Sequence, residues 1–345
     1  MIQMEIKIKT QSYHNNNLKT FMMERRNFTK NIALGALIPS AYTSMGFSEV
    51  RSSPAGSPGK EDEVIIERVT EGRPHKGKVL AVIQPHCDDI PIYAAGTVAK
   101  LIYEGYTGYL IRTSNDEAAG VGATLGERIL NNERDNFEVA KVLGLKKTFD
   151  LNYSNHRMDE YNIQEIKGRL IFLFRLLQVD TLICYDPWGT YEENPDHYIT
   201  ARAVEAARWM AGAVADYPEH LEVIKPHSVK EMYYFARGPQ IVNRVVDTSK
   251  FIDIKIESNI VCKTQGPGGD TGARLRKTLA EQGKKLPILG NDDHTANYNY
   301  IKEFVLGPDR ITGQKYGLEY AEAYHYIGPV PSPVDEYIKK NAVSL

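Results

Sequence analysis

Short apolar runs alternate with longer amphipathic stretches over the middle of the chain. The apolar runs are rich in β-branched residues, have the length of buried strands, and occupy residues 79–83, 109–113, 148–151 and 179–185. The stretches between them place apolar residues at helical spacing and cover residues 91–104, 126–143 and 163–177. This alternation predicts an α/β fold: a doubly wound, mostly parallel sheet with helices on both faces.

The pattern is less regular in the carboxyl-terminal third. Residues 229–235 and 244–247 are predicted to be further strands and residues 252–262 a helix, whereas the sequence from about 266 onward predicts no specific element. No Gly-x-Gly-x-x-Gly motif follows the first strand, so the fold is expected to be Rossmann-like without a dinucleotide site. We predict a single α/β domain over residues 64–345.

The amino-terminal region has the features of an export signal. Within residues 24–38, two adjacent arginines are followed by an aromatic residue, a lysine and a short apolar run. This arrangement resembles a twin-arginine signal, and the run is too short to span a bilayer stably. Residues 49–63 are polar and rich in Pro, Gly and Ser, which is typical of a flexible linker. We expect residues 1–48 to hold an upstream extension and the signal, and the mature protein to work in the periplasm or elsewhere outside the cytoplasm.

Composition excludes several classes of function. The chain has 345 residues, of which 42% are hydrophobic and 25% charged, as in ordinary globular proteins. A formal net charge of -2 gives no electrostatic footprint for nucleic acid, and the mature part shows no transmembrane helix. The cysteines at positions 87, 184 and 262 form no Cys-x-x-Cys pair, so neither a disulfide scaffold nor a cysteine-rich zinc site is predicted.

Candidate chemistry begins where the first strand ends, in the sequence Pro85-His86-Cys87-Asp88-Asp89. Polar groups at the carboxyl end of a strand lie where α/β folds place their sites. Imidazole and carboxylate groups are good zinc ligands, and a second carboxylate that stays off the metal can accept a proton from a bound water. Taken alone, this segment is equally consistent with a solvated turn.

A second motif, Asn194-Pro195-Asp196-His197, opens a predicted helix beyond the fourth strand. His197 alone is as consistent with a cap or a packing residue as with a ligand. Because both motifs fall on the same predicted edge of the sheet, His86, Asp89 and His197 together predict a two-histidine, one-carboxylate site with an open position for water. Zn²⁺ is the expected metal, with another divalent ion as the alternative.

The two motifs resemble those of the PIG-L/LmbE-like family of zinc-dependent N-deacetylases, which remove acetyl groups from N-acetylglucosaminyl compounds. The resemblance covers roughly residues 77–265 and implies a function for each motif residue. The implied roles are zinc ligands at His86, Asp89 and His197, a general base at Asp88, and an orienting carboxylate at Asp196.

Asn194 departs from the family pattern, because many members carry a histidine there that is thought to stabilise the oxyanion and protonate the leaving amine. Asparagine can donate a hydrogen bond to an oxyanion but cannot deliver a proton. Asp88 acting first as base and then as acid, His156 or Tyr191 would have to supply that proton. The other interpretation is that activity is weak or lost.

Two cysteines also depart from the family pattern. Cys87 replaces the usual proline, and its thiol is a potential competitor for zinc, although successive residues in an extended turn point apart. Cys262 replaces the histidine of the family's later His-x-Ser-Gln motif, which reads Cys262-Lys263-Thr264-Gln265 here. This change weakens any transfer of the family's substrate site.

Several residues near the predicted site are candidates for binding a sugar. Aromatic rings can stack on a sugar ring, and polar side chains at strand ends can bind its hydroxyl groups. Each is equally well explained by packing or by solvation of a loop. The candidates are Asn115, Glu117, Arg157, Trp188 and Tyr191.

The sequence therefore predicts an exported zinc-dependent hydrolase that removes an N-acetyl group from an amino sugar or glycoconjugate through a metal-bound water. Asp88, Asn194 and Asp196 are the predicted catalytic residues. One alternative is a carbohydrate-binding protein of the same fold with weak or no turnover. Another is a zinc amidase that acts on a non-sugar amide.

Overall fold

The computed structural model describes residues 64–329 and 332–344. The predicted export signal and linker lie outside these residues, so both stay predictions, as does the domain boundary at residue 64. Over the described residues, no helix combines the length and the apolar character needed to cross a membrane.

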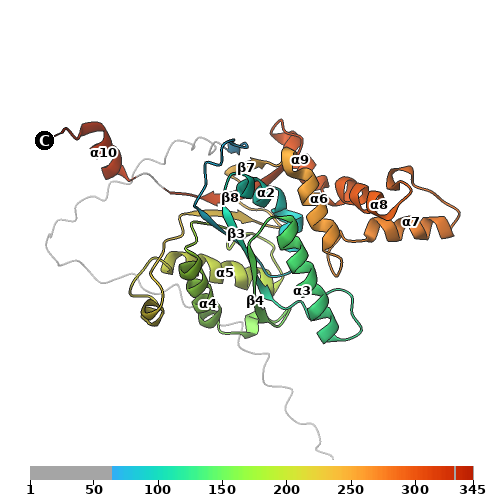
Figure 1. The fold of residues 1–345 in the computed structure, drawn as a ribbon, viewed down its shortest axis with the longest axis horizontal. Helices are drawn as coiled ribbons and strands as arrows, with labels where there is room; N and C mark the ends of the chain where they lie inside the picture. Colours follow the sequence, from blue (N-terminus) through green and yellow to red (C-terminus); the bar gives the residue numbers. More distant parts are fainter. Residues whose placement is uncertain (1–63, 330–331, 345) are drawn as a thin grey trace, which may run out of the picture. The chain divides into compact units, whose positions relative to one another are not determined.

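A mixed eight-stranded sheet forms the centre of the fold (Figure 1). Its strand order is β1-β7-β8-β6-β5-β2-β3-β4, and all pairings are parallel except those of β8 with β6 and β7. The strands are β1 (Ile65–Glu67), β2 (Val79–Gln84), β3 (Thr107–Ser114), β4 (Lys147–Tyr153), β5 (Thr181–Tyr185), β6 (Glu231–Phe235), β7 (Arg244–Asp247) and β8 (Ala321–Ile327).

Helices cover both faces of this sheet, which confirms the predicted fold class. Helix α6 contacts both α2 and α3 on one face, and α4 packs against α5 on the other (Figure 1). Because both faces are covered, every residue of β5 and nearly all of β2 are buried. The helices are α1 (Asp89–Tyr93), α2 (Ala95–Tyr103), α3 (Leu125–Val142), α4 (Ile163–Leu177), α5 (Pro195–Met210), α6 (Ile252–Val261), α7 (Thr271–Glu281), α8 (Asp293–Tyr300), α9 (Gly307–Lys315) and α10 (Pro333–Asn341).

The strand order places a topological switch point between β2 and β5. From β2 the chain runs outward through β3 to β4, and it then returns to pair β5 with the other edge of β2. In parallel sheets the loops on either side of such a point diverge and leave a crevice beyond the carboxyl ends of the strands. Both sequence motifs follow these two strands, so the topology brings them to one place.

One predicted helix is wrong in its extent. The sequence pattern predicts a single helix over 91–104, whereas the structure has α1, which starts at Asp89, and a separate α2 after a break at Ala94. Pro91 is tolerated because it lies in the first turn of α1. The break exposes new backbone N–H groups at the start of α2, and a carboxylate from β8 accepts them.

That carboxylate, Glu322, is the centre of a buried polar cluster. It accepts hydrogen bonds from the backbone N–H groups of Gly96 and Thr97, at 2.9 and 2.8 Å, and one from Lys255 Nζ at 2.7 Å. Lys255, on α6, is fully buried and also donates to Asp309. The cluster therefore joins β8 and α6 to the start of α2, the helix that follows the first motif and α1 in the chain.

We predict that Lys255→Met destabilises the fold, because it leaves Asp309 and Glu322 buried without their cation. Loss of one partner from a buried ion pair typically costs about 3–5 kcal/mol in the free energy of unfolding. Urea denaturation followed by circular dichroism measures this quantity. The control is Lys141→Met, which removes an exposed pair with Glu138 and should change stability very little. Equal changes in the free energy of unfolding for the two substitutions would contradict the role assigned to Lys255.

Candidate active site

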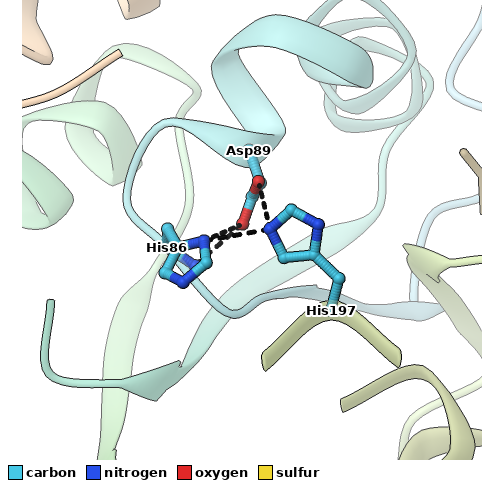
Figure 2. Close-up of side chains that lie close together, drawn as sticks. All are labelled: His86, Asp89 and His197. Carbon is cyan, nitrogen blue, oxygen red and sulfur yellow. Dashed lines mark hydrogen bonds and ion pairs between the residues drawn. The ribbon is translucent and has the colours of Figure 1, made fainter. Parts of the chain in front are cut away.

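The two sequence motifs meet at the carboxyl ends of β2 and β5. His86 follows β2, Asp89 begins α1, and His197 lies in the first turn of α5. His86 Nδ1 and His197 Nε2 are 3.0 Å apart, and each lies 3.5 Å from a carboxylate oxygen of Asp89 (Figure 2). All three side chains are buried. The structure thus brings together the three residues that were predicted as metal ligands.

Buried neighbours orient these side chains from outside the cluster. His86 Nε2 lies 3.0 Å from Asp196 Oδ2, and the Tyr185 hydroxyl donates to Asp89 Oδ1 at 2.7 Å. The Tyr185 ring also stacks on His197, with ring centroids 4.2 Å apart. Outer partners of this kind fix the orientation and tautomer of metal-binding histidines. They leave His86 Nδ1 and His197 Nε2 as the atoms that face each other.

The cluster of His86, Asp89 and His197 has surroundings that favour a bound cation. Burial alone lowers the pKa of His86, but the hydrogen bond to Asp196 and the charge of Asp89 outweigh it and raise the pKa to about 10. Surroundings that favour an added proton on an imidazole also favour another cation at the same place. The two ring nitrogens and a carboxylate oxygen lie within 4.8 Å of one another, and they form a donor set found in catalytic zinc sites. These residues therefore fit a divalent cation such as zinc.

Asp88 lies in the turn between β2 and α1 and lines the same cavity as the ligand cluster, a hollow of about 190 Å³. Burial and the charge of Asp89 raise the pKa of Asp88 to about 7, against the opposing effect of His86. The backbone of Gly266 lies close to this carboxylate, so that a Cβ at position 266 would be only 2.7 Å from Asp88 Oδ2. A carboxyl group with a pKa near neutrality is suited to act as a general base.

Asn194 also lines the cavity and caps helix α5. Its Oδ1 accepts a hydrogen bond from the backbone N–H of Asp196 at 3.0 Å. Because the side-chain oxygen is engaged in this cap, the amide Nδ2 is the group that can donate into the cavity. Asn194 therefore combines a structural role with a free hydrogen-bond donor.

Asp196 ties the loop after β4 to the site. This fully buried carboxylate accepts hydrogen bonds from the backbone N–H groups of His156 and Met158, at 2.7 and 3.2 Å, and from Asn155 Nδ2 at 2.9 Å. Burial by itself raises the pKa of Asp196, but the contact with His86 and these hydrogen bonds lower it overall. Asp196 thus holds both a predicted ligand and a neighbouring loop.

The two residues considered as substitute proton donors differ in position. His156 lines the cavity, and its ring lies edge-on to that of His86, with centroids 6.0 Å apart. Tyr191 is 89% exposed and does not line the cavity. Of the two, the structure places only His156 where it can reach a substrate.

The Cys87 thiol points away from the ligand cluster. Its Sγ lies 3.3 Å from Asn132 Oδ1, 3.4 Å from Cys262 Sγ and 3.3 Å from Gln265 Nε2. Burial raises the pKa of Cys87, so its neutral thiol form is favoured. In this arrangement Cys87 does not compete for the metal, and Gln265 lies between the thiol and the cavity.

The polar candidates for sugar binding do not line the cavity. Asn115 and Glu117 form hydrogen bonds with each other, and Arg157 points to solvent, where it pairs with Glu160 at 2.7 Å. Their position at strand ends is as the sequence predicts, but local partners engage their side chains.

The two aromatic candidates are also outside the cavity. Trp188 is 53% exposed and packs beside His325, with ring centroids 5.4 Å apart, while Tyr191 extends into solvent. Both belong to the loop that connects β5 to α5, so they lie near the second motif in sequence without reaching the ligands.

Four residues that contribute to the site were not predicted from the sequence. Tyr185 was assigned only to a buried strand, and Arg237, Tyr93 and Glu192 were assigned no role. Arg237 and Tyr93 line the cavity, and Glu192 Oε2 lies 3.1 Å from His197 Nδ1. Arg237 follows the carboxyl end of β6 by two residues, so the rule that placed both motifs at strand ends could have indicated it.

Comparisons with known proteins agree with this geometry. The sequence model of a family described as "PIG-L: GlcNAc-PI de-N-acetylase" matches residues 81–208, which include both motifs. A diacetylchitobiose deacetylase from Thermococcus kodakarensis is 25% identical over 194 residues, which span 55% of this chain and 71% of that protein. The resemblance predicted from the two motifs is therefore confirmed.

Solved structures share the fold. The N,N'-diacetylchitobiose deacetylase from Pyrococcus horikoshii superposes with a TM-score of 0.58 at 20% identity, over 76% of this chain and 89% of that one. The 4-carboxy-2-hydroxymuconate hydratase GalB from Pseudomonas putida has a TM-score of 0.53 at 16% identity, over 74% of this chain and 98% of that one. Because a hydratase shares the architecture, the fold alone does not define the reaction.

We predict that His197→Ala abolishes metal binding. The parent protein should retain about one zinc per chain after dialysis, and the variant should retain none, because one of three ligands is removed. Elemental analysis by inductively coupled plasma mass spectrometry measures the content. His294→Ala is the control, since His294 is an exposed histidine paired with Glu257. Retention of zinc by His197→Ala would refute the assigned ligand set.

Proposed function

Because the PIG-L family model matches residues 81–208, which hold both motifs, we propose that the chain is a zinc-dependent deacetylase of N-acetylated amino sugars or glycoconjugates. The observation that carries the proposal is the convergence of His86, Asp89 and His197 beside the free carboxylate of Asp88 in one cavity. The relative from Thermococcus kodakarensis is a diacetylchitobiose deacetylase, which supports a sugar substrate.

The cavity residues supply the steps of an amide hydrolysis. A divalent cation held by the three ligands would act as a Lewis acid that lowers the pKa of water and polarises the amide carbonyl. Asp88 accepts the proton of the attacking water. Asn194 Nδ2 donates a hydrogen bond to the oxyanion as the carbonyl carbon becomes tetrahedral. Asp88, or His156 across the cavity, then returns a proton to the nitrogen, and acetate and an amine are released.

We also propose that the protein acts outside the cytoplasm, after export by the twin-arginine route. The support is the sequence of residues 24–38 alone. Proteins exported by this route fold before they cross the membrane, so a metal could be bound before export.

An acetate-release assay tests the proposed reaction. We expect the zinc-loaded protein to release acetate from N,N'-diacetylchitobiose or N-acetylglucosamine and not from N-acetylated amino acids. Asp88→Asn should lower kcat by about 10²- to 10⁴-fold while zinc content is unchanged, because it removes a base and not a ligand. Release from the amino acids alone would favour a non-sugar amidase, and no release from any substrate would favour a binding protein.

A second experiment separates the two roles of Asn194. In Asn194→Asp the side chain still caps α5, but it can no longer donate to an oxyanion. We expect kcat to fall by about 10²- to 10³-fold with little change in Tm. Asn194→Ala removes both functions and should also destabilise the protein by about 1 kcal/mol. Parental activity in Asn194→Asp would show that the residue serves only the helix.

A further inference from the structure

One carboxylate holds three parts of the cavity wall. Glu192 lies in the loop between β5 and α5, and only 11% of its side chain is exposed. Its Oε1 accepts hydrogen bonds from Arg237 Nη2 at 2.7 Å and from the backbone N–H of Asn194 at 3.0 Å. Its Oε2 accepts one from Arg237 Nε at 3.1 Å and lies 3.1 Å from His197 Nδ1, an electrostatic contact that is not aligned as a hydrogen bond. Both oxygens are therefore fully used, and His197, Asn194 and Arg237 all line the cavity.

We propose that Glu192 is a positioning residue for the metal site, which acts through His197 and is itself held in place by Arg237. This inference rests on the proposed metal centre and extends it to residues that no part of either motif implies. The negative charge 3.1 Å from Nδ1 favours the tautomer with the proton on that nitrogen, which leaves Nε2, the atom that faces His86 and Asp89, free to bind a cation. A neutral side chain at position 192 would hold this tautomer less strongly.

A purely structural role for the Arg237–Glu192 pair is the main alternative, and the surrounding contacts argue against it. The two loops that carry these residues are already joined by backbone contacts. The Thr190 N–H and hydroxyl both donate to the Pro239 carbonyl, at 3.0 and 2.9 Å, and the Asp186 N–H donates to the Phe235 carbonyl at 2.8 Å. The loops therefore do not need the ion pair to stay together.

The pair is also more specific than a surface salt bridge. Arg237 uses two nitrogens on the two oxygens of Glu192, the fork geometry that fixes a carboxylate in orientation as well as in place. A carboxylate held in this way can fix the plane of the imidazole next to it. The same fork holds the guanidinium at the cavity wall, where Nη1 has no acceptor among the described residues.

Glu192→Gln tests the proposal, with Glu193→Gln as a matched control. The control makes the same change of charge one residue away, at an exposed side chain. We expect Glu192→Gln to weaken zinc affinity by about 10- to 100-fold, measured by competition with a chromogenic chelator, and Glu193→Gln to leave it unchanged. The metal-free forms of both variants should have the Tm of the parent. Equal zinc affinity in Glu192→Gln and the parent would overturn the proposal.

A spectroscopic measurement distinguishes positioning from general loosening of the fold. Co²⁺ bound in place of zinc reports the ligand geometry through its visible absorption bands. We expect these bands to change in Glu192→Gln and to match the parent in Glu193→Gln. Unchanged bands in Glu192→Gln would count against a positioning role even if affinity falls.

Arg237→Gln identifies which member of the pair acts on the ligand. This variant keeps the carboxylate next to His197, so its zinc affinity should fall much less than that of Glu192→Gln. A larger loss in Arg237→Gln than in Glu192→Gln would mean that the guanidinium acts on the site independently of the carboxylate, which contradicts the proposal. Failure of the parent protein to bind zinc would instead refute the metal centre itself, so the two failures can be told apart.

Discussion

The site depends on two imidazole nitrogens, His86 Nδ1 and His197 Nε2, that lie 3.0 Å apart and are surrounded by carboxylates. Two ring nitrogens at this distance need a proton or another cation between them. Asp89 lies beside both rings, Asp196 behind one and Glu192 behind the other. The raised pKa of His86 reflects this surplus of negative charge. A divalent cation would meet the same need and would also supply the Lewis acidity that amide hydrolysis requires.

The sheet topology makes this arrangement possible. The strands β2 and β5 are adjacent and parallel, so the residues that follow them emerge side by side, and the crossover directions keep the space above them open. Buried polar contacts then fix the positions of the loops and side chains that the strands bring together. Asp196 holds the loop after β4, and Glu322 holds the start of α2 behind the first motif. The precision of the site therefore depends on a few buried carboxylates as well as on the apolar core.

The sequence predicted the order of strands and helices from 79 to 185 and the edge on which both motifs lie, because hydrophobic periodicity and strand-end chemistry are local signals. It did not predict β1 or β8. Both pair with β7, and an edge or antiparallel strand depends on partners far along the chain. It likewise missed Tyr185 and Glu192, because their roles depend on the direction of a side chain, which apolar patterning does not encode. For the same reason, the sequence could not show that the side chains of Arg157 and Trp188 lie outside the cavity.

Zinc K-edge X-ray absorption on the zinc-loaded protein tests the central claim most directly, because it reports the atoms bound to the metal. The account predicts a first shell of nitrogen and oxygen only, with the multiple-scattering pattern of two imidazoles, since Cys87 points toward Asn132 and Cys262. A sulfur shell at about 2.3 Å, or a pattern without imidazole, would contradict it.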